Sequence, residues 1–464
     1  MGSQAGEPQK EYTVETVNPT IFREYDIRGL AESDFSESFA QELGKAFGTL
    51  LHENRESHVA IGRDCRLTSE KYTKALIHGL LTTGTHVINL GICPTPLVYF
   101  STFDQEFTNG ISVTGSHNPA EYNGFKLCLQ KQTLYGSNIQ DLKDRIQKKK
   151  FYKAPHPGNI SLFNIHESYQ KYILEHISLA RPLKLVVDAG NGVAGPLAPS
   201  LFQALGCTVS KLFCEMDGRF PNHFPDPTVP ENLKHLILKV QEEKADLGIA
   251  FDGDADRIGV IDSTGAIIWG DKLLILYARD ILKKHPGAPI IAEVKCSTQL
   301  FADIKKNGGR PILWKTGHSL IKSKIKEENA LLAGEMSGHM FFADRYYGFD
   351  DAVYAACRLL EIVSRSSYSL SDLLSDVPKT FSTPEIRIPC PDEKKFDVVN
   401  KVKSYFKSRY DTIDIDGVRI EFSDGWGLIR ASNTQPVLVL RFEATSERRL
   451  QEIKTLIENK LQEV

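Results

Sequence analysis

Three segments of the chain repeat one order of patterns: a short apolar strand, an amphipathic helix and a second strand. The first segment reads HVAIGRD, SEKYTKALIHGLLTTG and HVINLG between residues 58 and 91, and related patterns recur at 183–214 and 287–317. Each helix pattern ends near a glycine, which tolerates the left-handed conformation that commonly closes a helix. A strand–helix–strand unit that recurs three times predicts three mixed α/β domains of related design.

The last part of the chain follows a different pattern. Prolines cluster from about residue 378, which predicts a linker and the start of another unit, and a helix pattern follows at 394–410. Strand patterns at 413–422, 425–432 and 436–444 precede a closing helix at 446–464, so we expect an α+β domain with antiparallel hairpins. The length of 464 residues exceeds one hydrophobic core and alone suggests roughly three domains. The three repeated units and this C-terminal unit together predict four, at 1–160, 161–263, 264–377 and 378–464.

The overall charge and the cysteines limit the partners and the compartment. A formal net charge of −3 gives no general attraction to nucleic acid or to an anionic membrane, so we expect a small-molecule partner held by local basic groups. The eight cysteines form no CxxC pair, and the N-terminus lacks the charged start and apolar stretch of a secretory signal. These features predict reduced thiols and a cytoplasmic protein. Both a monomer and a dimer remain open.

An acidic loop between two strand patterns predicts a cation site. In IAFDGDADR, three aspartates occupy alternate positions, Asp252, Asp254 and Asp256. A divalent cation would cancel their repulsion, and oxygen-only ligands favour Mg²⁺ or Ca²⁺. An EF-hand is disfavoured because its sixth and twelfth positions are Arg257 and Ser263 instead of Gly and Glu. A solvated polar turn is the alternative.

A serine stands on a sharp turn after an apolar strand pattern. In ISVTGSHNPAEYNGFKL, Gly115 allows a close backbone approach to Ser116, and Asn118-Pro119 marks the turn. The chain has no GxSxG elbow here, so acyl transfer is poorly supported. Ser116 is instead a candidate carrier of a phosphoryl group beside a cation. An ordinary turn serine, with His117 as a hydrogen-bonding neighbour, is the alternative.

Two further loops suit a sugar phosphate. In LLAGEMSGHMFF, Glu335 is able to accept hydrogen bonds from two neighbouring sugar hydroxyls. In RASNTQP, Arg430 stands with hydroxyls, an amide and backbone N–H groups, a set of donors that suits phosphate. Each loop taken alone is also compatible with a plain turn.

A glycine pattern supports a rival hypothesis. Gly190, Gly192 and Gly195 form GxGxxG after a strand pattern, and Glu215 ends the next strand, as in an NAD-dependent dehydrogenase. Pro196 and Pro199 are expected to shorten the following helix, so we favour glycines that permit tight strand–helix packing.

Two more rivals address the aspartates and the loops as a whole. An aspartyl phosphotransferase of the haloacid dehalogenase type requires DxDx[TV], but the fifth position here is Asp256. A sugar-phosphate-binding regulator without turnover would retain all the loops.

Four motifs in order give a resemblance that covers the chain from about residue 22 to the end. Ser-His-Asn-Pro, Asp-Gly-Asp-Ala-Asp-Arg, Gly-Glu-Met-Ser-Gly-His and Arg-Ala-Ser-Asn-Thr resemble the α-D-phosphohexomutase superfamily. The third motif is similar to the bacterial phosphomannomutase/phosphoglucomutase branch; the phosphoglucosamine branch, with Gln where Met336 stands, remains the alternative. The resemblance implies a heart-shaped protein in which four domains each contribute one loop to a central cleft.

The resemblance also implies a reaction. Such an enzyme interconverts hexose 1-phosphate and hexose 6-phosphate, of mannose, glucose or both, through a phosphoserine and a hexose 1,6-bisphosphate that reorients. It implies phosphorylated Ser116 and Mg²⁺ held by Ser116, Asp252, Asp254 and Asp256.

The remaining roles implied by the resemblance fall into three groups. The catalytic candidates beside Ser116 are Arg28, Lys126, His117, His318 and His339. The candidate substrate contacts are Tyr25, Arg28, Arg257, Lys272, Lys295, His318, Glu335, Met336, Ser337, Gly338 and His339, although Lys272 stands where Arg is expected. The candidate phosphate loop is Arg430, Ala431, Ser432, Asn433 and Thr434. A reorienting intermediate is best recognised through its 3- and 4-hydroxyls, so we expect Glu335 and Ser337 to contact that diol.

Overall fold

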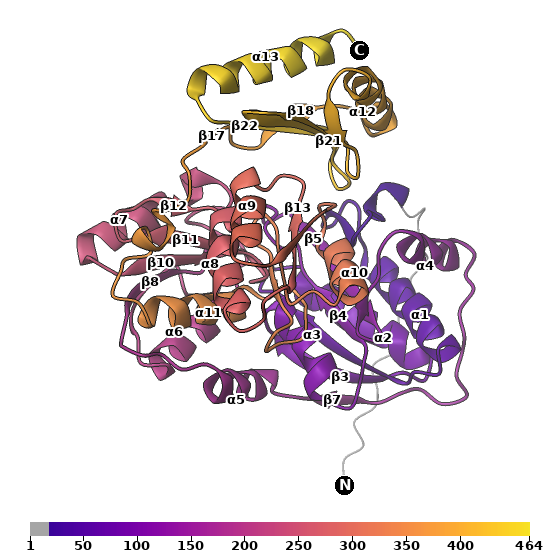
Figure 1. Cartoon of the computed structure of the whole chain (residues 1–464). Coiled ribbons are helices and arrows are strands. Elements are labelled where there is room, and N and C mark those ends of the chain that lie inside the picture. The colour runs from indigo at the N-terminus through magenta and orange to yellow at the C-terminus, as the bar shows by residue number, and fades with distance from the viewer. Residues whose placement is uncertain (1–17) are drawn as a thin grey trace.

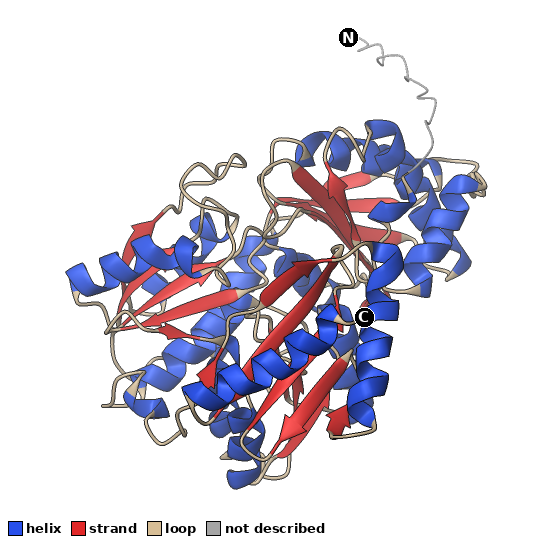
Figure 2. Ribbon diagram, turned by 90° about the horizontal axis from the view of Figure 1, so that it is seen from above, coloured by secondary structure: helices blue, strands red, loops and turns tan. Residues whose placement is uncertain are grey.

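A computed structural model describes residues 18–464, so the first seventeen residues of the first expected domain lie outside the description. Four β-sheets follow one another along the chain, and helices flank them (Figures 1 and 2). The fold is therefore of the predicted class, with three α/β units and a distinct C-terminal unit.

The first sheet has seven strands, in the order β1-β5-β4-β2-β3-β7 with β6 paired to β5. The strands are β1 (Ile27–Leu30), β2 (His58–Arg63), β3 (His86–Ile92), β4 (Gly110–Val113), β5 (Tyr122–Leu129), β6 (Gln132–Thr133) and β7 (Ile160–Leu162). The helices of this domain are α1 (Glu37–Glu53), α2 (Ser69–Thr82), α3 (Thr95–Asp104) and α4 (Ser137–Gln147).

The second sheet has the order β12-β11-β10-β8-β9, and the third has the order β14-β13-β15-β16. The second domain contains β8 (Lys184–Asp188), β9 (Thr208–Leu212), β10 (Leu247–Phe251), β11 (Ile258–Asp262) and β12 (Ile267–Ile268), with α5 (Ile165–His176), α6 (Ala194–Ala204) and α7 (Lys234–Glu243). The third contains β13 (Pro289–Glu293), β14 (Arg310–Trp314), β15 (Leu332–Gly334) and β16 (Met340–Phe342), with α8 (Gly270–Leu282), α9 (Thr298–Lys306), α10 (His318–Glu328) and α11 (Ala352–Ser364).

The three domains share one four-stranded unit. In each, the first strand pairs in parallel with the second and the third, and the third pairs antiparallel with the fourth. The hairpin between the third and fourth strands is therefore equivalent in all three domains. These hairpins are residues 114–121, 252–257 and 335–339, which contain the serine, aspartate and sugar motifs. The repeat explains why three unlike motifs share one structural position.

The fourth sheet is antiparallel and contains β17 (Phe381–Ser382), β18 (Ile386–Pro389), β19 (Asp411–Ile413), β20 (Val418–Phe422), β21 (Gly425–Ala431) and β22 (Val437–Ala444). Helices α12 (Asp392–Lys407) and α13 (Glu447–Gln462) complete this domain, drawn in yellow in Figure 1. The single strand predicted over 413–422 was wrong, because a turn at Gly417, with φ of +76°, separates β19 from β20. Part of the proline-rich segment predicted as a linker forms edge strands on β22.

One large hydrophobic cluster extends through the first three domains, and each of these domains also has a smaller separate cluster. The large cluster extends from Val98 and Phe100 on α3, through Val187 on β8, to Leu274 on α8 and Val353 on α11. The fourth domain has its own core, and a small cluster of Val294, Trp426 and Leu428 joins it to the third. The apolar contact that joins the fourth domain to the third is therefore smaller than the apolar core shared by the first three domains.

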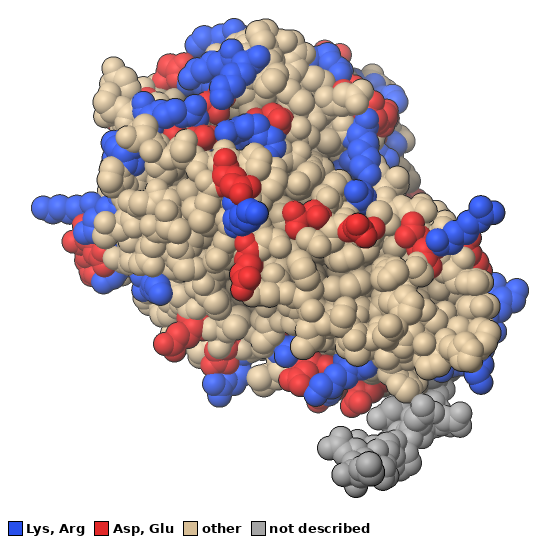
Figure 3. All heavy atoms as spheres, turned by 90° about the horizontal axis from the view of Figure 1, so that it is seen from below, with Lys and Arg blue, Asp and Glu red and all other residues tan. Residues whose placement is uncertain are grey.

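The helices and the surface charges bear on the partners that the sequence predicts. Within residues 18–464, no helix combines the length and apolar character needed to span a membrane. On the face shown in Figure 3, basic and acidic side chains are interspersed. An anion therefore meets no extended field of one sign on that face and needs local donors.

Candidate active site

Loops from all four domains enclose a cleft of about 610 Å³. This volume lies in the range of small-molecule sites, which is typically about 300–1,000 Å³. Fourteen of the predicted site residues line it: Tyr25, Arg28, His117, Arg257, Lys295, His318, Glu335, Met336, Ser337, His339, Arg430, Ser432, Asn433 and Thr434.

The other predicted residues lie elsewhere. Ser116, Lys126 and the three aspartates are buried and do not contribute to the lining itself. Gly338 and Ala431 are also buried and absent from it, and Lys272, on the first turn of α8, is absent too. The structure thus gives no support for a contact between Lys272 and a ligand in this cleft.

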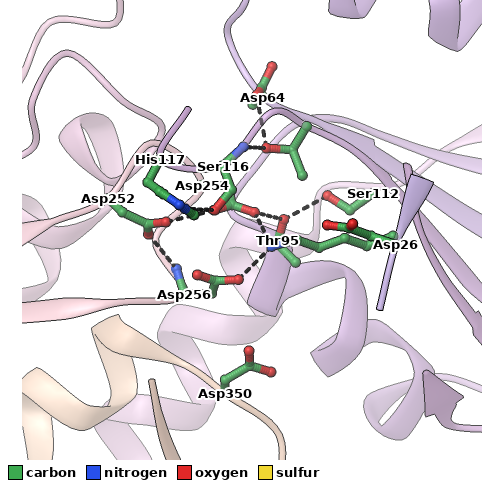
Figure 4. Close-up of polar contacts among 12 residues, drawn as sticks. Asp26, Asp64, Thr95, Ser112, Ser116, His117, Asp252, Asp254, Asp256 and Asp350 are labelled. Atoms are coloured by element: carbon green, nitrogen blue, oxygen red, sulfur yellow. Dashed lines mark hydrogen bonds and ion pairs between the residues drawn. The ribbon is translucent and has the colours of Figure 1, made fainter. Parts of the chain in front are cut away.

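Ser116 occupies a constrained position directly after β4. Its φ of +50° lies in the left-handed region, which is uncommon for a residue other than glycine. The Oγ atom donates a hydrogen bond to Asp252 Oδ2 at 2.9 Å and lies 3.2 Å from His117 Nδ1. Burial, followed by the charges of Arg257 and Arg28, holds the pKa of His117 well below its usual range. The serine hydroxyl thus lies between a carboxylate and a neutral imidazole (Figure 4).

Arg66, which the sequence analysis did not identify, fixes the serine loop through buried hydrogen bonds to its backbone. Its buried guanidinium donates to the carbonyl oxygens of Ser116 at 2.7 Å, Tyr122 at 3.2 Å and Asn118 and Pro119, and it pairs with Asp64 at 3.0 Å. Asp64 also accepts hydrogen bonds from the Gly115 N–H and the Thr114 hydroxyl. The available signal was GRDCR, charged residues directly after the first strand of a repeat.

The three aspartates converge on the β10–β11 hairpin. Ligand oxygens of Asp252, Asp254 and Asp256 lie within 4.8 Å of one another, and all three side chains are buried. Asp252 Oδ1 accepts from the backbone N–H groups of Asp256 and Arg257, at 3.0 and 3.1 Å, so the loop folds around its first carboxylate. Thr95, on α3, donates to Asp254 Oδ2 at 2.6 Å (Figure 4).

Lys126 balances part of this negative charge from the neighbouring domain. Its Nζ atom donates to Asp254 Oδ2 at 2.7 Å and to Asp256 Oδ2 at 2.5 Å. Burial is the largest influence and acts to raise the pKa of both carboxyls. Lys126, acting with the Thr95 hydroxyl at Asp254 and with His339 and Arg257 at Asp256, outweighs it, so both values are lowered. Within residues 18–464, Asp252 forms no ion pair, and burial together with the other two carboxylates raises its pKa well above the usual range. The cluster therefore needs more positive charge than Lys126 supplies.

Two observations show that these residues fit a divalent cation. Asp254 Oδ1 and Asp256 Oδ1 are buried and find no hydrogen-bond partner within residues 18–464. Such atoms are rare in native structures because desolvation is costly without compensation. Oxygen ligands from three carboxylates, with Ser116 Oγ 2.9 Å from Asp252, form a donor set typical of a hard cation.

Asp350, which the sequence reasoning also missed, connects two predicted histidines. Arg257 Nε donates to His339 Nε2 at 3.0 Å, so the His339 proton resides on Nδ1, which lies 3.1 Å from Asp350 Oδ2. His318 Nδ1 lies 3.8 Å from the same oxygen, and burial, then Lys322, holds the pKa of His318 well below its usual range. The signal for Asp350 was an acidic pair directly before α11.

The 335–339 loop is fixed by hydrogen bonds and by one close approach. Glu335 accepts from the Gly317 N–H and the Ser337 hydroxyl, both at 3.0 Å. Gly338 has a φ of +92°, and a Cβ there would lie 2.3 Å from the Ile258 carbonyl oxygen. Glycine is thus required where this loop crosses β11, and Glu335 is held ready to accept hydrogen bonds.

The 430–434 loop contributes cationic and neutral donors. Arg430 pairs with Asp416 at 2.9 Å, while Ser432 Oγ accepts from the backbone N–H of Gln435 at 3.1 Å. Asn433 Nδ2 donates to the Tyr25 hydroxyl at 2.5 Å, which links the fourth domain to the first. Lys395, unpredicted and buried on α12, donates to the Ser432 carbonyl oxygen and supports the loop.

Other missed residues lie on the rim of the cleft. Glu385, in the predicted linker, accepts from Lys295 Nζ at 3.0 Å. The charge of Lys295, assisted by that of Arg387, outweighs burial and lowers the pKa of Glu385 to about 2. A proline-rich loop of the second domain contributes Asp226, Thr228, Val229 and Pro230, and the third domain contributes Trp269. Proline clusters after strands were the only signal for most of these residues.

The GxGxxG glycines serve packing. A Cβ on Gly192 would lie 2.8 Å from the Gly253 carbonyl oxygen in the aspartate loop, and one on Gly195 would lie 2.0 Å from the Cys214 carbonyl oxygen. The space where a pyrophosphate would approach is thus filled by protein. The expected shortening of the following helix was wrong, because α6 keeps eleven residues and continues through Pro199.

Comparisons with known proteins agree with this geometry. The chain matches the descriptions "Phosphoglucomutase/phosphomannomutase, alpha/beta/alpha domain" I at 19–153, II at 167–265 and III at 269–381, and the C-terminal domain at 385–460. It is 49% identical over 450 residues to a Pseudomonas aeruginosa protein named phosphomannomutase/phosphoglucomutase, covering 97% of each chain. A Neisseria meningitidis phosphoglucomutase is 44% identical over 437 residues, covering 94% of this chain and 95% of that one.

A solved structure is similar over the whole length. The crystal structure of a phosphoglucomutase/phosphomannomutase family protein from Burkholderia thailandensis has a TM-score of 0.91 and 43% identity, covering 96% of this chain and 98% of that one.

Proposed function

The chain belongs to the phosphoglucomutase/phosphomannomutase family, and from that premise we propose that its cleft carries out phosphoryl transfer through Ser116. The protein is an enzyme, an isomerase that interconverts hexose 1-phosphates and hexose 6-phosphates of mannose, glucose or both. The observation that carries the assignment of Ser116 is its hydroxyl, which lies 2.9 Å from the first aspartate of the acidic loop.

In the proposed mechanism, phosphorylated Ser116 transfers its phosphoryl group to the free 6-hydroxyl of a hexose 1-phosphate. The resulting hexose 1,6-bisphosphate reorients, and its 1-phosphoryl group returns to Ser116, leaving the 6-phosphate. Mg²⁺, bound by Ser116, Asp252, Asp254 and Asp256, would neutralise charge on the transferred group. The buried, unpartnered oxygens of Asp254 and Asp256 support this assignment.

The chain's own residues hold the protons and charges around the transfer. His117 Nδ1, 3.2 Å from Ser116 Oγ, is positioned to exchange a proton with the serine oxygen. Arg28 and Lys126 stabilise negative charge, because Arg28 lines the cleft and Lys126 contacts two carboxylates. His339, oriented by Arg257 and Asp350, and neutral His318 are the candidates for proton transfer with the sugar hydroxyl.

The opposite end of the cleft holds the phosphate that does not react. Arg430, Ser432, Asn433 and Thr434 supply a guanidinium and neutral donors there. Between the two ends, Glu335 and Ser337 contact the 3- and 4-hydroxyls, whose places are nearly equivalent in the two orientations. A site indifferent to carbon 2 accepts both glucose and mannose.

Replacing Ser116 by Ala tests the assignment. We expect loss of mutase activity on both hexose 1-phosphates on the order of 10⁴-fold, as for removal of a nucleophile, and loss of the phosphopeptide. Intact mass, phosphopeptide mapping and a coupled assay with added hexose 1,6-bisphosphate provide the measurement. Turnover at the wild-type rate would contradict the proposal.

Replacing Glu335 by Ala tests the diol contact. We expect kcat/KM to fall by about tenfold to a hundredfold for glucose and mannose substrates alike, because both present the same hydroxyls to a charged acceptor. A loss confined to one sugar would contradict this role. Glucosamine 1-phosphate belongs in the same assay, since faster turnover of that substrate would favour the phosphoglucosamine alternative.

We further propose a cytoplasmic location, supported by eight free thiols.

A further inference from the structure

A second and smaller cavity lies between the first and third domains, outside the cleft. Its volume is about 40 Å³, and α10 with residues 347–349 faces α3 and the β5–β6 turn across it. Three lysines line it: Lys131 from the first domain, and Lys322 and Lys326 from α10. None of these residues belongs to the proposed reaction.

The charges around this cavity are not balanced. Lys322 donates to Asp350 Oδ1 at 3.0 Å, but Lys131 and Lys326 form no ion pair with any carboxylate in the described chain. Lys326 donates to the Lys131 carbonyl oxygen at 3.3 Å. Partial burial of the ammonium group, opposed by Cys128 and assisted by Lys322 and Lys131, lowers the pKa of Lys326, although the residue as a whole is exposed. Within the described residues, only one of the three ammonium groups thus pairs with a carboxylate, an arrangement that an anion would relieve.

The backbone at Lys131 adopts a conformation that is unfavourable for lysine, and hydrogen bonds from the surrounding structure hold it there. Gln130 and Lys131 form the two-residue turn between β5 and β6 with φ values of +49° and +62°. Such turns strongly prefer Asn-Gly, because other residues meet steric resistance at positive φ. The Gln130 N–H donates to Asn109 Oδ1 at 2.9 Å, and the Lys131 N–H to the Thr108 carbonyl oxygen at 2.7 Å. The surrounding structure therefore keeps lysine where glycine would be easier.

We propose that this cavity binds a phosphate-sized oxyanion, held by Lys131 and Lys326 together with Lys322 and the Ser319 and Ser323 hydroxyls. Its volume admits a phosphoryl group but not a whole hexose. Cys128 also lines it, and burial raises the pKa of that thiol to about 12, so the thiol adds no negative charge. The ligand is either free phosphate or the phosphoryl end of a sugar phosphate whose ring stays in solvent.

Helix α10 connects this cavity to the cleft. Its first residue, His318, lines the cleft, whereas Ser319 and Lys322 line the cavity. Asp350, which accepts from Lys322, lies 3.1 Å from His339 on its other oxygen. An anion that draws Lys322 away from Asp350 therefore changes how Asp350 orients His339, although the anion does not bind in the cleft. Phosphate bound in this cavity therefore lowers kcat, whereas phosphate bound in the cleft competes with substrate and lowers its apparent affinity.

Binding is measured with the cleft blocked. The Ser116→Ala protein is saturated with hexose 1,6-bisphosphate, and radiolabelled inorganic phosphate is added in equilibrium dialysis. We expect saturable binding that weakens by about tenfold for each lysine removed in Lys131→Gln/Lys326→Gln, as each charged hydrogen bond is lost. The control Lys283→Gln/Lys284→Gln changes the same charge at two exposed lysines of the third domain and should bind like the parent.

Two outcomes would overturn the proposal. One is that no phosphoryl group enters the cavity at all: radiolabelled phosphate does not bind once the cleft is blocked, and the bisphosphate itself binds at one molecule per chain and not two. This outcome needs no lysine variant. The other is equal binding by the parent and the cavity variant. Competition by glucose 6-phosphate identifies the phosphoryl end of a metabolite as a ligand, and lack of competition identifies free phosphate; both results support the oxyanion site.

Kinetics test the connection to the cleft. With Ser116 present, inorganic phosphate should lower both kcat and apparent affinity in the wild type, but only apparent affinity in Lys131→Gln/Lys326→Gln. Purely competitive inhibition of the wild type would overturn the proposed effect on His339.

Discussion

The serine loop and the aspartate loop occupy equivalent hairpins in the first two domains, yet they are stabilised in different ways. The serine loop is fixed from within its own domain, where Arg66 and Asp64 bind its backbone and its flanking Thr114. The aspartate loop depends on the first domain for charge and hydrogen bonds, through Lys126 and Thr95. One loop thus has local support, and the other has support from a neighbour.

The two loops therefore have different requirements: the serine loop needs support for its backbone conformation, and the aspartate loop needs positive charge. The strained φ of Ser116 requires a rigid local frame, whereas three carboxylates require cations that their own hairpin does not supply. The two loops touch, because a Cβ on Gly253 would lie 2.4 Å from the Ser116 carbonyl oxygen. The shared core of the first three domains holds that contact in place. The nucleophile and the cation site are therefore assembled only when both domains are docked.

Replacing Lys126 by Met tests whether the aspartate loop depends on positive charge from the first domain. Removing one partner of a buried ion pair leaves uncompensated carboxylates, so we expect the free energy of unfolding to fall by about 3–5 kcal/mol in EDTA. Mg²⁺ should restore more stability to this variant than to the wild type, because binding to the folded state stabilises it and no ammonium competes. Urea unfolding with and without Mg²⁺ provides the measurement.

A matched control is Lys71→Met, which removes a lysine from an exposed pair with Glu32 and should change little. If Mg²⁺ stabilised Lys126→Met no more than the wild type, the aspartate loop would not depend on positive charge from the first domain.

Replacing Arg66 by Met tests the local frame. Four carbonyl oxygens and Asp64 lose a buried donor, and we expect a loss of about 3 kcal/mol in stability. Mg²⁺ should not restore this loss preferentially, because the defect lies in the backbone of the serine loop. The same urea series with and without Mg²⁺ measures the difference between the two variants.

Arg219 is exposed, and its only ion pair within residues 18–464 is with Asp217, two residues away. The variant Arg219→Met is therefore a control that should unfold like the wild type. Recovery of Arg66→Met by Mg²⁺ to the same extent as Lys126→Met would remove the distinction between the loops.

The sequence predicted the loops better than their supports. Ser116 and the three aspartates stand in motifs whose chemistry is readable from neighbouring residues. Arg66 lies 50 residues before the serine in a segment that appears only as a strand end, and its partners are backbone carbonyls that any residue supplies. The equivalence of the three hairpins also depends on strand pairing, which no local pattern specifies.

Residues that act across domain boundaries were missed for the same reason. Glu385 lies among prolines that favour a linker, and its role follows from Lys295, 90 residues earlier. Asp350 precedes a helix, where an acidic residue is common without any function. Its position between His318 and His339 results from the folding of the third domain. Prediction stopped where function depends on contacts between distant residues.

The Lys295–Glu385 pair gives the comparison a third case, a cross-domain pair at the edge of the cleft. The folded-state pKa of Glu385, about 2, lies below its ordinary value of 4.5. The pair therefore stabilises the folded protein above about pH 4.5, and this contribution is lost as the pH falls towards 2. The Glu385 side chain is 23% exposed, so solvent partly screens the pair. We therefore reduce the free energy of unfolding that corresponds to this pKa shift to about 2 kcal/mol.

Glu385→Gln should therefore unfold more easily than the wild type by about 2 kcal/mol at pH 7, and the difference should shrink below pH 4.5. Urea unfolding of both proteins between pH 7 and the acid limit of the folded state, on the order of pH 3–4, measures this change. Glu32→Gln removes an exposed carboxylate and should leave stability nearly unchanged. A difference that did not depend on pH would mean that Glu385 acts by packing and not by charge. The aspartate loop would then be the one site of the three whose stability depends on a lysine from another domain.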